Sequence, residues 1–165
     1  MDMVDLKQPE LYINRELSQI EFIQRVLDLA EDETIPLLER LQYLCISSTN
    51  LDEFFEIRVA GLIQMVELGS VQMGPDNMTP GEVLSLISER AHRLVKDQYR
   101  VLNDSILPLI EAEGIKTIKR DQWTSEQEAW LSDYFDRELS PVLSPLGLDP
   151  SHPFPRILNK SLNFI

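Results

Sequence analysis

Stretches of apolar residues at helical spacing, each opened by capping residues, constrain the fold of this chain more than any other feature. The clearest helix start is Thr79-Pro80-Gly81-Glu82, which combines an N-cap, a first-turn proline and a carboxylate at the third helical position. Apolar residues then recur at helical spacing to about residue 112. An amphipathic helix buries its apolar side only against another element, so four such segments predict a small helical bundle.

Three further helices are expected before this one. Ser18 and Glu21 form an S-x-x-E capping box, which predicts a first helix that ends at an acidic run. A second helix starts near Pro36, and a third covers residues 51–68 with Gly69 as its natural stop. The second helix is expected to bury Leu37, Leu38, Leu41, Leu44 and Cys45.

The second and third helices are expected to meet at a cluster of small polar residues that ends in Thr49 and Asn50. Both are good N-cap residues, and Asp52 and Glu53 follow them by three positions, as in a capping box. Capping explains these two carboxylates better than an acid/base pair or magnesium ligands. Backbone amides are unpaired at such a junction, and the Asn50 amide offers two donors and one acceptor, so a polar ligand edge could be read there.

The character of the sequence changes after Gly114, which closes the last bundle helix. Residues 115–118 are expected to form a short strand. Thr124 and Gln127 then cap a helix that continues to about residue 139. The remaining residues, 140–165, are rich in proline and are expected to be extended, with a final strand that lacks a partner.

The predicted fold class is therefore mainly α. Residues 1–112 are expected to form an N-terminal helical domain, a four-helix bundle. Residues 113–165 are expected to be an incomplete α+β segment that starts the following domain, because they are too short and too often interrupted by proline for a complete one.

Charge excludes several classes of partner. The chain carries 15 Lys and Arg against 28 Asp and Glu, for a net charge of −13. Nucleic acid and other polyanions need clustered cations, so we expect no nucleic-acid binding. No apolar run approaches the length of a transmembrane helix. Cys45, the only cysteine, suits a reducing cytoplasm and is expected to be a buried, inert thiol.

The residues that phosphate or metal chemistry requires are missing from the sequence. The six glycines are scattered and build no phosphate-binding loop, and no metal-ligand constellation is present. His92 is expected to face solvent within the long helix, and His152 lies in the extended segment, so neither is assigned a catalytic role. We therefore expect no catalytic residue and no metal ligand in this chain.

Several separated motifs nevertheless resemble one family in order and spacing. The first block consists of Asn14-Arg15-Glu16-Leu17-Ser18, Pro36-Leu37-Leu38-Glu39-Arg40-Leu41, Asn50-Leu51-Asp52-Glu53-Phe54-Phe55 and Arg58-Val59-Ala60-Gly61-Leu62. A second block begins at Pro141-Val142-Leu143-Ser144-Pro145-Leu146. Together they resemble the N-terminal domain, and the start of the next domain, of the large bacterial polyphosphate kinases. The loop between Gly69 and Met78 matches nothing.

The resemblance implies an enzyme that transfers the terminal phosphate of ATP to polyphosphate. It implies that the N-terminal domain covers one side of the ATP adenine, with Asn50 as the contact and Tyr43 as a neighbour that packs against the ring. A phosphorylated histidine and the magnesium ligands lie in later domains, so this polypeptide alone is expected to be inactive. The remaining kinase domains, ATP and polyphosphate are the implied partners, in a cytoplasmic homo-oligomer that associates with membranes when full length.

An alternative from another class stays open: a stand-alone helical protein-interaction module without catalysis. The length of the reading frame separates the two. Continuation for several hundred residues with a phosphorylatable histidine favours the kinase, whereas a stop codon after Ile165 favours the module.

Overall fold

The structure, a computed structural model, describes residues 5, 8–151, 153–158 and 160–164. The chain divides into two compact units, Met1–Lys116 and Thr117–Ile165, and each unit is described by itself. Helices are the regular secondary structure of the described residues, and none of these helices is long and apolar enough to cross a bilayer.

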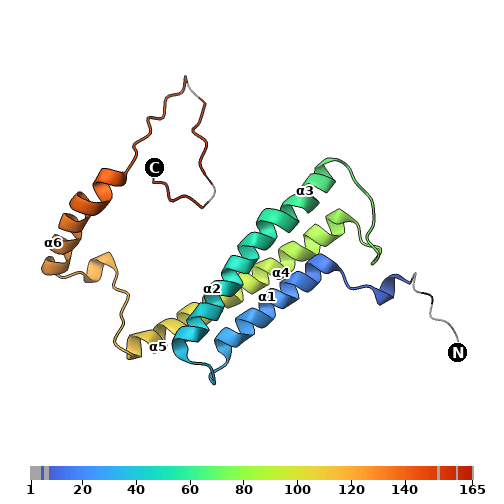
Figure 1. The fold of residues 1–165 in the computed structure, drawn as a ribbon, viewed down its shortest axis with the longest axis horizontal. Coiled ribbons are helices and arrows are strands. Elements are labelled where there is room, and N and C mark those ends of the chain that lie inside the picture. Colours follow the sequence, from blue (N-terminus) through green and yellow to red (C-terminus); the bar gives the residue numbers. More distant parts are fainter. Residues whose placement is uncertain (1–4, 6–7, 152, 159, 165) are drawn as a thin grey trace. The chain divides into compact units, whose positions relative to one another are not determined.

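The first unit is an elongated bundle of helices that lie side by side (Figure 1). A short 3-10 helix at Pro9–Leu11 precedes it. The predicted mainly α fold, with four N-terminal helices, is confirmed. The helices of this unit are α1 (Arg15–Glu31), α2 (Leu37–Glu53), α3 (Ala60–Glu67), α4 (Pro80–Arg100) and α5 (Leu107–Ala112).

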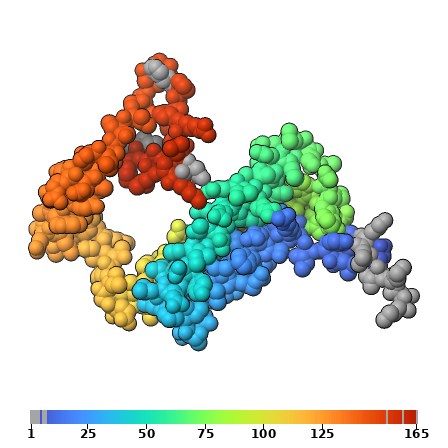
Figure 2. Space-filling model, viewed as in Figure 1, coloured from blue at the N-terminus to red at the C-terminus, as the bar shows by residue number. Residues whose placement is uncertain are grey.

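Two of the connections inside the bundle are helical themselves. A π-helical turn at Phe54–Val59 joins α2 to α3, and a second at Val101–Ile106 joins α4 to α5. The bundle therefore consists of α1 and two continuous rods, which we call the α2–α3 rod and the α4–α5 rod. Contacts link α1 with α2 and α4, and α4 with both α2 and α3. In the space-filling view the surface of α1 (blue) lies directly against that of α2 (Figure 2).

The expected junction between the second and third helices is wrong. Glu53 and Phe54 keep helical backbone angles, and the Phe54 N–H donates to the carbonyl oxygens of Asn50 and Leu51. The polar cluster is not a loop, because Ser47 within it is fully buried in the bundle. Tertiary packing thus overrides the local preference of Ser, Thr and Asn for helix ends. Asn50 lies in the last turn of α2 and caps nothing.

The π-helical turns keep one face of each rod on the core. A π-helical turn adds a residue to the helical repeat. In the α2–α3 rod, buried positions follow helical spacing up to Phe54 and then jump by five residues to Val59. In the α4–α5 rod the same jump separates Val101 from Ile106. Each turn therefore corrects the phase of the buried stripe.

Two of the starts predicted from sequence have different outcomes. The α4 capping box is confirmed: the Glu82 N–H donates to Thr79 Oγ1 at 3.3 Å, and the Thr79 N–H donates to Glu82 Oε2 at 2.8 Å. The predicted Ser18 cap is wrong. Asn14 caps α1, since its Oδ1 accepts hydrogen bonds from the amides of residues 16 and 17 at 3.0 Å. Glu21 instead pairs with Arg90 of α4.

The core is formed by buried residues of α1, α2 and α4 and of the two π-helical turns. Its largest fully buried side chains are Ile23 and Leu27 of α1, Ile87 and Leu94 of α4, and Val101 and Ile106 of the π-helical turn between α4 and α5, with Ser47 from α2. The burial predicted for Leu38 and Cys45 is wrong, because both are exposed. The inward face of α2 is instead set by Arg40, Leu44, Ser47 and Leu51.

Both bundle rods end in a left-handed residue, as predicted. Gly69 has φ of +70° and Gly114 has φ of +88°, a region that favours glycine. After α3 the amides of Gly69 and Ser70 donate to carbonyl oxygens in the last turn at 2.9 Å, which is the Schellman arrangement. A tight turn forms at residues 74–77, with the Asn77 N–H donating to the Gly74 carbonyl at 3.0 Å.

The second unit has little regular structure. Its main helix is α6 (Ser125–Tyr134), capped by Thr124 and Gln127 as predicted, and a π-helical turn (Phe135–Leu139) extends it. Short 3-10 helices occupy Arg120–Gln122 and Ser140–Val142. The strand predicted at residues 115–118 is wrong. No strand forms in the described part of 159–165 either, and Asn159 and Ile165 lie outside the described residues.

A physical reason accounts for the missing strands. A strand is stable only when a neighbouring strand pairs with its backbone, and the described residues of this unit offer no such neighbour.

Trp130 and Tyr134 of α6 stack on each other with ring centroids 5.3 Å apart, yet both side chains are exposed.

Candidate functional site

Asn50, the residue singled out from sequence, is half-buried in the last turn of α2. Its backbone carbonyl accepts from the Phe54 amide, where the helix passes into the π-helical turn. Its side chain has no hydrogen-bond partner among the described residues. An Asn amide presents two donors and one acceptor, so this group is free to bind a polar ligand.

Tyr43 lies seven residues before Asn50 on the same helix. Seven residues are about two helical turns, or about 10 Å along the axis, so both side chains leave the same side of α2. Tyr43 is half-buried and packs against the core. The fold thus places the two side chains on one flank of α2, about two helical turns apart.

A buried hydrogen-bond chain holds α2 one turn before Asn50. Ser47 Oγ donates to the carbonyl oxygen of Ile23 in α1 at 3.4 Å and accepts from Gln98 Nε2 of α4 at 2.9 Å. Ser47 is 0% exposed and Gln98 is 8% exposed. A single hydroxyl therefore links α1, α2 and α4, and we call this the Ser47–Gln98 link.

A second buried polar contact lies nearer the start of α2. Arg40 is 5% exposed and donates from Nε to the Ala30 carbonyl at 2.8 Å and from Nη2 to Ser105 Oγ at 3.0 Å. The cation lies at the negative end of the α1 dipole. Just beyond that end, the Thr34 hydroxyl and amide donate to the Asp32 carboxylate and lower its pKa, and the charge of Arg40 acts in the same direction.

Neither contact was expected from the sequence. Ser47 belongs to the cluster that resembled a helix junction, and Arg40 is of a type that is usually exposed. The sequence does contain a signal for their burial. Arg40 and Ser47 fall on the helical spacing of four and three residues that also contains Leu44 and Leu51.

Asp52 and Glu53 lie exposed in the last turn of α2 and cap no helix. The described residues hold no group of three or more acidic, histidine or cysteine side chains able to bind a metal ion. His92 is exposed, with Nδ1 at 2.7 Å from the Ser88 carbonyl oxygen. His152 lies outside the described residues.

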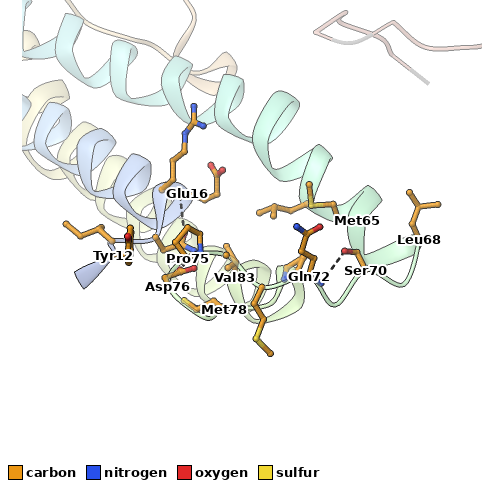
Figure 3. A pocket seen from close by; sticks show the side chains of 17 residues that line it. Tyr12, Glu16, Met65, Leu68, Ser70, Gln72, Pro75, Asp76, Met78 and Val83 are labelled. Carbon is orange, nitrogen blue, oxygen red and sulfur yellow. Dashed lines mark hydrogen bonds between the residues drawn. The ribbon is translucent and has the colours of Figure 1, made fainter. Parts of the chain in front are cut away.

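A cavity lies at one end of the bundle (Figure 3). Neither Asn50 nor Tyr43 is among the residues that line it. It has a volume of about 750 Å³ and opens between the start of α1, the end of α3, the Ser70–Met78 loop and the start of α4. Its lining is mainly apolar and includes three methionines, Met65, Met73 and Met78. No sequence motif indicates this cavity, because none falls in the loop that closes it.

Polar groups hold one wall of the cavity. Asn14 Nδ2 donates to Asp76 Oδ2 at 2.6 Å, which attaches the loop to the start of α1. Glu16 Oε1 lies 3.8 Å from Arg58 Nη1, a weak pair because Arg58 is partly exposed. Glu16 Oε2 is buried and has no hydrogen-bond partner among the described residues.

Comparison with known proteins adds independent information. Residues 12–118 match the family model for the polyphosphate kinase N-terminal domain, and residues 126–165 match the model for the polyphosphate kinase middle domain. The polyphosphate kinase of Pseudomonas syringae pv. tomato is 51% identical over 161 residues, which cover 98% of this chain and 22% of that protein. The Xylella fastidiosa enzyme is 50% identical over 159 residues, covering 96% and 23%.

A solved structure agrees with these matches. The crystal structure of polyphosphate kinase from Porphyromonas gingivalis has a TM-score of 0.73 and 31% identity, over 88% of this chain and 20% of that one. The chain therefore spans about a fifth of the length of the relatives that it matches. Two family models in succession and about 50% identity over nearly the whole chain lead to one conclusion: this chain belongs to the polyphosphate kinase family.

Proposed function

We propose that this chain is the N-terminal part of an ATP:polyphosphate phosphotransferase. Residues 1–112 form its N-terminal helical domain and residues 113–165 start the following domain. The match of the two family models in this order supports the proposal, as do the relatives named polyphosphate kinase. The intact enzyme is a cytoplasmic homo-oligomer that associates with membranes.

The role of the helical domain is to contact one side of the ATP adenine. The observation that carries this role is the half-buried side chain of Asn50, which has no partner among the described residues. An Asn amide matches the paired donor and acceptor of an adenine edge, N6 and N7. Because α2 is held on both sides by α1 and α4, it presents that amide with little loss of conformational entropy. Tyr43, on the same flank, packs against the nucleotide as a second contact.

The phosphate chemistry belongs to other domains of the enzyme. The described residues hold no group of three or more acidic, histidine or cysteine side chains that could bind a metal ion, and we place the magnesium ligands in the other domains. The net charge of −13 repels polyphosphate. This polypeptide alone therefore transfers no phosphate, and the histidine that becomes phosphorylated lies elsewhere. Polyphosphate synthesis by the purified 165-residue chain with ATP and magnesium would contradict this.

The test of the adenine contact is Asn50→Asp in the full-length enzyme that carries this sequence. The change keeps the shape of the side chain but removes two donors and adds a negative charge beside a nucleotide. We expect the KM for ATP to rise by about fivefold or more, the size of effect expected from one lost hydrogen bond. The Tm should stay constant, since Asn50 caps no helix and bonds to no other described side chain.

Asn103→Asp provides the matched control. It makes the same chemical change on an exposed position of the α4–α5 rod and should leave the KM for ATP unchanged. An unchanged KM in Asn50→Asp, or an equal rise in both variants, would show that Asn50 does not contact the nucleotide.

A further inference from the structure

We infer that Ser47 and Gln98 are positioning residues for Asn50: their buried hydrogen bond fixes the rotation of α2 and thereby the direction of the Asn50 amide. This inference rests on the proposed adenine contact and deepens it. It starts from the Ser47–Gln98 link, which lies one helical turn before Asn50.

The geometry of the link supports this role. Apolar attraction has no preferred direction, whereas a hydrogen bond needs a narrow range of distances and angles, so a buried hydrogen bond adds a directional constraint to the packing of α2. Ser47 Oγ accepts from Gln98 Nε2 at 2.9 Å and donates to the Ile23 carbonyl at 3.4 Å. These bonds attach one turn of α2 to α4 on one side and to α1 on the other.

The burial of Ser47 and Gln98 raises the free-energy cost of breaking the hydrogen bond between them. Ser47 is 0% exposed and Gln98 is 8% exposed, so water cannot replace either partner if α2 rotates. Asn50 projects from the next turn of the same helix. A rotation of α2 large enough to break the link would also turn the Asn50 side chain away from the proposed position of the adenine.

The π-helical turn increases the need for such a device. It begins at Phe54, whose amide donates to the carbonyl oxygens of both Asn50 and Leu51. Helical hydrogen bonding therefore changes its register immediately after Asn50, and π-helical turns are less regular than α-helix. The Ser47–Gln98 link fixes the last turn before this change.

The test is the double variant Ser47→Ala with Gln98→Met in the full-length enzyme. Replacing both partners of a buried hydrogen bond by apolar groups of similar shape leaves no unsatisfied polar group and is nearly neutral for stability. We expect the Tm to stay near that of the parent and kcat to change by less than about twofold. We expect the KM for ATP to rise by about three- to tenfold, because a misdirected amide loses much of one hydrogen bond.

Ser105→Ala is the matched control. It removes a partly buried hydrogen-bond partner of Arg40, a residue that lies ten positions before Asn50 on α2. It therefore weakens the same packing of helices at a distance from the site. It should lower the Tm and leave the KM for ATP unchanged. An equal rise of KM in this control would overturn the positioning role, because it would indicate a general loosening of the bundle.

The outcomes separate this inference from the adenine contact. If Asn50→Asp raises the KM for ATP and the double variant does not, Ser47 and Gln98 are structural only and the contact stands. If Asn50→Asp also leaves KM unchanged, both proposals are wrong. Should the double variant fail to fold, Gln98→Met alone removes the bond to α4 while Ser47 keeps its bond to Ile23. An unchanged KM in that variant would overturn the inference equally.

Discussion

Arg40 on α2 donates a hydrogen bond from Nε to the Ala30 carbonyl oxygen at 2.8 Å, in the last turn of α1. The last four carbonyl groups of a helix have no partner within it, and here a buried guanidinium supplies one. A second bond from Nη2 to Ser105 extends the contact to the α4–α5 rod. One side chain thus joins all three parts of the bundle at the end where α1 stops.

Removing this guanidinium should destabilise the bundle. Arg40→Met keeps much of the apolar stem but leaves the Ala30 carbonyl and the Ser105 hydroxyl with one partner fewer. We expect the free energy of unfolding to fall by about 2 kcal/mol, the usual cost of buried polar groups left unpaired. Urea unfolding followed by circular dichroism measures it. Lys96→Met, on an exposed face of α4, should change stability by less than about 0.5 kcal/mol. Equal effects of the two changes would contradict this reading of Arg40.

The π-helical turn in the α2–α3 rod leads to a prediction about two neighbouring residues, Arg58 and Val59. With an uninterrupted α-helix, position 58 would follow Phe54 on the buried face, whereas in the structure Val59 is buried and Arg58 is partly exposed. Val59→Asn should lower the free energy of unfolding by about 2–4 kcal/mol, because it buries an unsatisfied amide and removes apolar contacts.

Arg58→Gln is the neighbouring control. It should cost less than about 1 kcal/mol, since a partly exposed ion pair at 3.8 Å contributes little. Thermal or urea unfolding of both variants ranks them. The reverse order, with Arg58→Gln the more harmful change, would mean that the rod continues as a regular α-helix through this region.

The capping box of α4 should contribute a pH-dependent part of the stability. Hydrogen bonds from the Thr79 amide and hydroxyl lower the pKa of Glu82 below its ordinary value of 4.5. A carboxyl group whose pKa is lowered by folding adds stability that is fully present above its unfolded-state pKa. That stability is lost as the pH falls through the folded-state pKa.

Glu82→Gln removes this ionisation. The difference in Tm between the parent and Glu82→Gln should therefore be largest near neutral pH and should shrink as the pH falls from about 5 to about 2. Glu67→Gln makes the same change of charge at an exposed position without a capping bond and serves as the comparison. A parent-minus-variant difference for Glu82→Gln that is constant across this range would rule out the carboxylate as the origin of the cap's contribution.

Cys45 is exposed on α2, contrary to the expectation from its sequence pattern. An exposed thiol reacts with a disulfide reagent such as 5,5′-dithiobis(2-nitrobenzoate) without unfolding, whereas a buried thiol reacts only when the chain opens. We expect one thiol per 165-residue chain to react under native conditions at a rate close to that in denaturant. Protection by several orders of magnitude would show that Cys45 is buried after all.

Local signals in the sequence determined where most helices begin and end. Thr79 with Glu82, and Thr124 with Gln127, cap helices as predicted, and Gly69 and Gly114 stop them in the left-handed conformation. These features depend on the residue and its near neighbours alone. The mainly α fold followed from the same signals, since amphipathic segments of this length pack against one another.

The candidate site was only partly predictable. Asn50 and Tyr43 were identified by a motif and a resemblance, and their contact with a nucleotide stays a prediction. Their expected setting at a helix junction was wrong, because the bundle buries Ser47 and keeps Asn50 inside a continuous helix. The cavity beside Asn14 and Asp76 depends on a contact between residues 62 positions apart, which no local pattern indicates.

The sequence by itself thus determined the helical class of the chain, the caps at Thr79 and Thr124 and the stops at Gly69 and Gly114, because these follow from interactions within a few residues. Tertiary structure alone decided that α2 and α3 form one rod, that Arg40 and Ser47 face inward, and that Cys45 faces outward. The physical reason is that packing against α1 and against the other rod selects one phase of each rod. The π-helical turns ending at Val59 and Ile106 maintain that phase by adding a residue where the regular α repeat would have turned the buried stripe away.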